Sequence, residues 1–172
     1  GVAGGGVTAA VLASNQSSVI GTPQGPTAIT VNDPGDATLV TGVVATAMPS
    51  VVSLQVAGGG TAGGGSGVIL SEDGYVLTNN HVATLEGATL TPSIRVSLSD
   101  GRIFNAELVG SDPLADIAVV KIEGAENLPV IEFADSDALN VGDRAIVIGA
   151  PLGLSGTVTN GIVSALNRSI TV

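Results

Sequence analysis

The sequence predicts an all-β protein, a small barrel or a sandwich, on three observations. Six short apolar runs follow one another between Val51 and Ile122, and turn signals such as Asp73-Gly74 and Asp100-Gly101 separate them. Valine and isoleucine are frequent in these runs, and β-branched residues favour strands. Only 2% of the residues are aromatic, so Val, Ile, Leu and Ala must form the core.

Each apolar run is expected to form one strand of a first unit. The predicted strands are Val51–Val56, Ser66–Leu70, Tyr75–Thr78, Ile94–Leu98, Ile103–Gly110 and Ile117–Ile122. The glycine stretch 58–65 is expected to be a flexible connection between the first two strands. Glu72-Asp73-Gly74 and Ser99-Asp100-Gly101 are expected to be tight turns, as several short strands joined in this way require.

Two further strands are expected after the first unit, at Ala145–Ile148 and Thr157–Leu166, around the turn at residues 149–153. Two strands cannot bury both of their faces, so they must pair with the first unit, with a partner chain or with further sequence. Ser136-Asp137 predicts a cap for a short helical turn. Another short helical turn is expected at residues 42–48, ending before Pro49.

The chain divides into four predicted segments. Residues 1–13 are apolar, small and uncharged, and they are too few for the roughly 20 residues that cross a bilayer. They are interpreted as the remnant of a transmembrane or signal segment, or as a flexible tail. Residues 14–42, rich in Ser, Thr, Gly and Pro, are expected to be a linker. Residues 43–135 are expected to form the first barrel, and residues 136–172 the incomplete start of a second.

Composition excludes several classes of function. The 172 residues contain no cysteine and one histidine, which rules out disulfides and disfavours a structural zinc site. A net charge of −10 argues against binding to nucleic acid or to an anionic membrane surface. Glycines 58–65 lack the context of a phosphate-binding loop, and Asp135, Asp137 and Asp143 lack the spacing of a calcium loop. No metal and no cofactor are therefore expected.

The only histidine and one aspartate are the candidate catalytic residues. His81 follows Leu77-Thr78-Asn79-Asn80, where a strand ends, and an imidazole is a suitable general base near neutral pH. Asp112 and Asp116 are both candidate partners, and chemistry alone leaves the choice between them open. Asp116 directly precedes an apolar strand, so its carboxylate is expected at a barrel rim, where it can accept the Nδ1 proton of His81.

Several motifs that include these residues resemble those of the HtrA/DegP family of trypsin-like serine proteases. The resemblance extends over residues 43–168, and the actinobacterial, membrane-tethered members are the most similar in character. It implies a chymotrypsin-like double β-barrel, an extracytoplasmic location and a catalytic role for Asp116, and the family often carries a C-terminal PDZ domain. The segments that carry the resemblance are Gly74–Val82, Asp112–Lys121, Leu139–Gly153 and Thr157–Leu166.

The family's nucleophile motif, of the type Gly-Asn-Ser-Gly-Gly, does not occur in this sequence. Ser66 and Ser155 lie in glycine-rich stretches and are expected to be structural. We therefore expect His81 and Asp116 without the serine, and no peptidase activity from this chain alone.

The resemblance implies partners as well as chemistry. These are unfolded or misfolded protein substrates, the missing C-terminal half of the protease domain, and other copies of the full-length protein in a homo-oligomer. The alternative functions are a non-catalytic, peptide-binding or chaperone-like β-module and a structural, adhesion-like β-domain.

Overall fold

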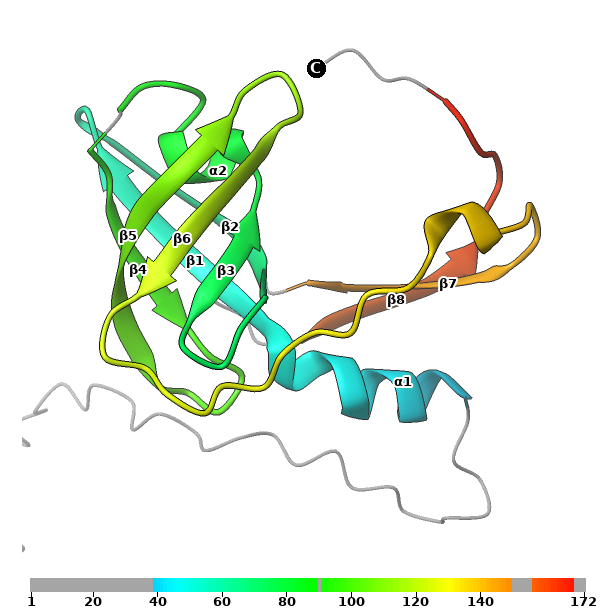
Figure 1. Cartoon of the computed structure of the whole chain (residues 1–172). Coiled ribbons are helices and arrows are strands. Elements are labelled where there is room, and N and C mark those ends of the chain that lie inside the picture. The colour runs from blue at the N-terminus through cyan, green and yellow to red at the C-terminus, as the bar shows by residue number, and fades with distance from the viewer. Residues whose placement is uncertain (1–38, 90, 150–155, 169–172) are drawn as a thin grey trace, which may run out of the picture.

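The structure is a computed structural model that describes residues 39–89, 91–149 and 156–168. Within these residues, six strands close a barrel in the order β1-β2-β3-β6-β5-β4, and two further strands form a separate small sheet (Figure 1). The predicted all-β fold is confirmed. Residues 1–13, most of the expected linker, the turn at 150–153 and Ser155 lie outside the described residues.

The strands observed in the described residues follow the predicted order. Those of the barrel are β1 (Val51–Gly58), β2 (Thr61–Ile69), β3 (Tyr75–Thr78), β4 (Ser93–Ser97), β5 (Ile103–Asp112) and β6 (Ile117–Ile122), and those of the small sheet are β7 (Arg144–Gly149) and β8 (Thr157–Ile162). The helices are α1 (Leu39–Ala47) and α2 (Asn80–Thr84), with 3-10 turns at Met48–Ser50 and Ser136–Ala138.

The glycine stretch is where the structure differs most from the expected fold. It is not a loop: Thr61 onward belongs to β2, which pairs with β1 as far as Gly58↔Thr61. Only Gly59 and Gly60 turn the chain, and both have positive φ, as a two-residue hairpin requires. These positions of the strand need glycine because neighbouring atoms leave no room for a side chain. A Cβ at Gly64 would lie 2.6 Å from the Leu54 carbonyl oxygen.

The core fills the barrel with aliphatic side chains from alternate positions. Val52, Leu54 and Val56 of β1 point inward and are almost completely buried, as are Val76 of β3 and Val120 of β6. Each such side chain contributes about 1.5–3 kcal/mol when it leaves water. The barrel is therefore a stable platform for the residues at its rim.

The two helical predictions need correction in part. Helix α1 ends before Pro49, as predicted, but it begins at Leu39, inside the segment expected to be linker, and Pro49 lies in the following 3-10 turn. The turn at Ser136–Ala138 is capped by Asp135, whose carboxylate accepts from the Asp137 amide, and not by Ser136 or Asp137.

Among the described residues, no helix has both the length and the apolarity needed to cross a bilayer.

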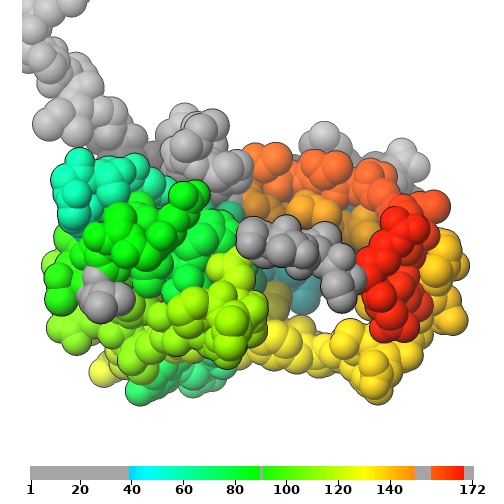
Figure 2. Space-filling view, turned by 90° about the horizontal axis from the view of Figure 1, so that it is seen from above, coloured from blue at the N-terminus to red at the C-terminus, as the bar shows by residue number. Residues whose placement is uncertain are grey.

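The β7–β8 sheet lies beside the barrel. Figure 2 shows the green barrel and the orange sheet as two lobes, joined by the residues coloured yellow. The joining segment is attached to the barrel by main-chain bonds, from the Leu128 amide to the Glu72 carbonyl and from the Ile131 amide to the Ile69 carbonyl. Strand β8 ends at Ile162, short of the predicted Leu166, and the side chains of Val147 and Ile162 are about two-thirds exposed.

Candidate functional site

His81 is presented by a short helix directly after β3. The sequence predicts only a turn there, whereas Asn80–Thr84 form the five residues of α2. Buried Ala83 anchors the helix on the barrel, and Thr84 closes it by donating to the Asn80 carbonyl and accepting from the Gly87 amide. The helix thus holds the His81 side chain on the outer surface of the barrel, where half of its area is exposed (51%).

The barrel register brings Asp116 to the same place. Strands β3 and β6 run antiparallel with Thr78 opposite Ala118, so residues just after β3 lie beside residues just before β6. Asp116 is the last residue before β6, and its φ of +51° is left-handed. This conformation costs an L-residue on the order of 1 kcal/mol, and aspartate is among the residues that tolerate it.

The structure separates the two candidate aspartates. Asp112 Oδ1 accepts from the Leu114 and Ala115 amides at 2.9 and 3.2 Å, so this carboxylate stabilises the turn between β5 and β6. Asp116 Oδ2 lies 2.8 Å from His81 Nδ1, and Asp116 Oδ1 accepts from the His81 amide at 3.0 Å. The predicted contact between the histidine and a rim carboxylate is present, and Asp116 makes it.

Asn79 was not singled out from the sequence, although it lies in the histidine motif. Its amide nitrogen donates to Asp116 twice, to Oδ2 and to the backbone carbonyl, both at 3.1 Å. Two adjacent asparagines precede His81, and nothing in the sequence distinguishes Asn79 from Asn80. Only the register of β3 against β6 shows which of them faces the aspartate.

These contacts favour the ionised form of Asp116. Hydrogen bonds from the His81 amide and then from its ring are the main causes that lower the pKa of Asp116 below its ordinary 3.8, with partial burial opposing them and Asn79 adding to them. An ionised Asp116 accepts a proton-bearing Nδ1, so Nε2 is the ring nitrogen that can exchange a proton with a reacting group.

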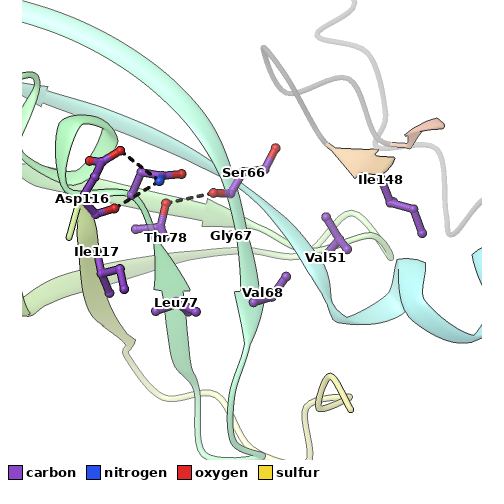
Figure 3. Close-up of a pocket in the computed structure, with 10 residues that line it drawn as sticks. Val51, Ser66, Gly67, Val68, Leu77, Thr78, Asp116, Ile117 and Ile148 are labelled. Carbon is purple, nitrogen blue, oxygen red and sulfur yellow. Dashed lines mark hydrogen bonds between the residues drawn. The ribbon is translucent and has the colours of Figure 1, made fainter. Parts of the chain in front are cut away.

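A pocket opens next to this pair on the outer face of β2 and β3 (Figure 3). Apolar side chains, among them Val51, Val68 and Leu77, form much of its wall, and Ile148 of β7 lies across it from the barrel. Ser66 lies in β2, where its carbonyl accepts from the Thr78 hydroxyl at 2.8 Å. Apolar walls with a few polar groups are typical of a binding cleft.

A second hollow is lined by His81 itself. Its other walls include Gly63 and Gly64 of β2 and Leu85 and Glu86 after α2. His81 is thus accessible from a concave surface. Among the residues that the structure describes, no group of three or more His, Cys, Asp and Glu is arranged to hold a metal ion.

Comparison with known families and proteins agrees with this geometry. The model of the trypsin-like peptidase domain matches residues 65–171. The periplasmic serine endoprotease DegP of Escherichia coli K12 is 54% identical over 120 residues, which are 64% of this chain and 24% of that protein. The serine protease PepD of Mycobacterium tuberculosis is 46% identical over 132 residues, which are 74% of this chain and 28% of PepD.

Solved structures give the same result. The HtrA-type protease AlgW with a tripeptide superimposes with a TM-score of 0.68 at 42% identity, covering 77% of this chain and 42% of that chain. The chain spans about a quarter of the length of the curated relatives described above. The chain is similar in sequence and barrel topology to HtrA-type serine proteases, and it belongs to the family of the trypsin-like peptidase domain.

Proposed function

We propose that this chain supplies the general base and its orienting carboxylate, His81 and Asp116, to a serine endopeptidase. The observation that carries the proposal is the 2.8 Å contact between His81 Nδ1 and Asp116 Oδ2 at the rim of a closed barrel. Family membership supports the class of reaction, and the contact supports the two proposed roles.

Each residue has one part in the proposed reaction. His81 Nε2 takes the proton of a serine hydroxyl as that hydroxyl attacks the scissile carbonyl, and later gives the proton to the leaving amine. Asp116 keeps the neutral ring protonated on Nδ1 and stabilises the imidazolium that forms between the two steps. The ring is half-exposed and lines one hollow, and Asp116 lines the other, so a substrate bound at this surface is proposed to reach the ring.

The serine is proposed to come from polypeptide that completes the second barrel, in a Gly-x-Ser-Gly-Gly motif. The apolar side chains of Val147 and Ile162 are exposed and suit burial under further strands. Ser66 and Ser155 are proposed to be structural. Because triad members act as a unit, loss of the serine costs about 10⁶ in turnover, so this chain alone is proposed to be inactive.

The substrates and the location are proposed from the family resemblance. The matched DegP of Escherichia coli K12 is named a periplasmic serine endoprotease, and we propose an extracytoplasmic location for this protein as well. Unfolded or damaged proteins are its proposed substrates, and the full-length protein is proposed to be a homo-oligomer. Anchoring to the membrane through residues 1–13 stays a prediction from the sequence.

The proposal is tested by the coding sequence that follows Val172 and by cleavage of casein. We expect a Gly-x-Ser-Gly-Gly motif there, and we expect the protein that contains it to cleave casein in a reaction that a serine-directed inhibitor blocks. His81→Ala in that protein should abolish cleavage, because His81 is the only histidine in this sequence and an imidazole is a suitable general base near neutral pH.

Two results would contradict the proposal. Inhibitor-sensitive cleavage by the 172-residue chain alone would show that a serine within it is the nucleophile. Full activity of the longer protein with His81→Ala would remove the role of the histidine. Suppressed aggregation of unfolded casein without cleavage, unchanged by His81→Ala, would favour the chaperone-like module instead.

A further inference from the structure

We propose that Asn79 is a positioning residue, which holds the Asp116 carboxylate in the orientation that accepts the Nδ1 proton of His81. The inference rests on the proposed function, because it concerns the same pair. The Asn79 amide nitrogen carries two hydrogens, and it donates to Oδ2 and to the backbone carbonyl of Asp116. One side chain thereby fixes the carboxylate relative to its own backbone.

The turn that carries Asp116 has little packing to hold it. Residues 113–116 connect β5 and β6; the first three of them are exposed, and Leu114 is fully exposed. Asp112 closes the first part of this turn, but its bonds end at Leu114 and Ala115. Asp116 itself has a left-handed backbone, which a non-glycine residue keeps only when neighbouring contacts hold it. Asn79 provides such a contact.

Asn79 also departs from the usual behaviour of an asparagine in its position. It is the residue that precedes α2, with φ −84° and ψ 148°, where an asparagine oxygen normally accepts an amide of its own helix. The Asn79 side chain makes no such bond. Instead Asp116 Oδ1 accepts the free His81 amide at the start of the helix, and Asn79 binds Asp116. The backbone carbonyl of Asn79 accepts from the Ala83 amide, as in any helix start, but its side chain contributes to the helix only through the aspartate.

Two donors converge on one carboxylate oxygen. Oδ2 of Asp116 receives both His81 Nδ1 and Asn79 Nδ2, while Oδ1 receives only the His81 amide. Without Asn79, only His81 itself would hold the carboxylate, through its amide and its ring, and the side-chain link to the Asp116 backbone carbonyl would be lost. Asn79 is also among the groups that lower the pKa of Asp116, so its removal should raise that pKa.

The test uses NMR on the full 172-residue chain, whose single histidine gives one unambiguous set of ring signals. Ring nitrogen shifts report which nitrogen carries the proton, and carboxyl carbon shifts report the titration of Asp116. In the wild type we expect a neutral ring protonated on Nδ1. Asn79→Ala should abolish the preference for Nδ1 and raise the pKa of Asp116. The matched control is Asn80→Ala, which should change neither.

Asn79→Ser separates positioning from simple support of the helix. Serine is as good a residue as asparagine at the start of a helix, but its short side chain has one hydrogen to donate and cannot make both bonds to Asp116. We expect Asn79→Ser to fold with an intact α2 and still lose the Nδ1 preference. This variant decides the question if Asn79→Ala fails to fold.

The outcomes distinguish the inference from the proposed function. A wild-type ring that shows no preference for Nδ1 would overturn both. A clear wild-type preference that survives Asn79→Ser would overturn the inference alone. A preference lost equally in Asn80→Ala would also overturn it, because the effect would then belong to the helix and not to Asn79.

Discussion

At the scale of single residues, the site combines one half-exposed imidazole with one carboxylate whose two oxygens are both occupied. Asp116 accepts hydrogen bonds on Oδ1 and on Oδ2, and those on Oδ2 come from two different side chains. A carboxylate bound in this way has a fixed orientation as well as a fixed charge. Replacement of Asp116 should therefore change the tautomer of the His81 ring much more than the stability of the fold.

Asp116→Asn should reduce kcat by about 10⁴ in the polypeptide that carries the nucleophile, because an amide in this place favours the wrong tautomer of His81. The measurement is steady-state cleavage of casein. Asp112→Asn is the matched control: its amide oxygen can still accept from the Leu114 and Ala115 amides, so kcat should stay within a few-fold. Equal losses in the two variants would refute the assignment of Asp116.

At the scale of elements, β2 and α2 depend on each other. Gly65 of β2 lies under Val82 of α2, and a Cβ added at Gly65 would lie 2.6 Å from Val82 Cγ2 and 2.8 Å from Cγ1. Real Cβ atoms do not approach this closely, so one of the two elements would have to shift. The glycines of β2 therefore determine how near the helix that carries His81 can lie to the barrel.

Gly65→Ala should destabilise the chain by about 1–3 kcal/mol, as overpacking usually does, and should weaken the His81–Asp116 contact by displacing α2. Thermal melts and the ring signals of His81 provide the measurements. The double variant, Gly65→Ala with Val82→Ala, should recover much of the lost stability and much of the His81–Asp116 contact. Gly110→Ala is the control in a strand, since nothing lies within 4 Å of its Cβ, and its effect should be below about 0.5 kcal/mol.

Prediction from sequence succeeded at this scale where the signals are local. β3 and β6 have the predicted bounds because Asp73-Gly74 and Asp112-Pro113 mark the turns before them. The prediction of a loop at the glycines of β2 was wrong. Glycine is needed in this strand because Leu54 and Val82, from other segments, approach it closely, and the local sequence does not show these contacts. Helix α2 was missed because five residues contain little periodicity.

The candidate site was predictable in part for the same reason. The motifs around His81 and Asp116 are contiguous, so their chemistry could be recognised from the sequence. The choice of Asp116 over Asp112 on physical grounds, and the contribution of Asn79, both depend on the pairing of Thr78 with Ala118. That register is a property of the closed barrel and not of any one segment.

At the scale of the whole molecule, the barrel and the small sheet differ in how they are covered. The barrel buries its aliphatic interior from Val52 to Ile122, whereas Val147 and Ile162 of the small sheet are about two-thirds exposed. Exposed apolar strands with unpaired edges invite pairing with other chains. We therefore expect the sheet, and not the barrel, to govern the solution behaviour of the chain.

The 172-residue chain should self-associate, and Val147→Thr with Ile162→Thr should reduce the association, because threonine keeps the strand preference with less apolar area. Sedimentation velocity over a range of concentrations measures the effect. Ile103→Thr is the control, since Ile103 is similarly exposed but lies on the barrel. A chain that stays monomeric at high concentration, with one sharp melting transition, would contradict the prediction.

The place of β6 in the barrel has a consequence for the order of assembly. β6 is the last barrel strand to leave the ribosome, and it inserts between β3 and β5, which are made earlier. Until β6 is in place, nothing brings Asp116 to His81. During synthesis the chain therefore gains its His81–Asp116 contact only when the barrel closes, and a half-made molecule carries an imidazole without that carboxylate.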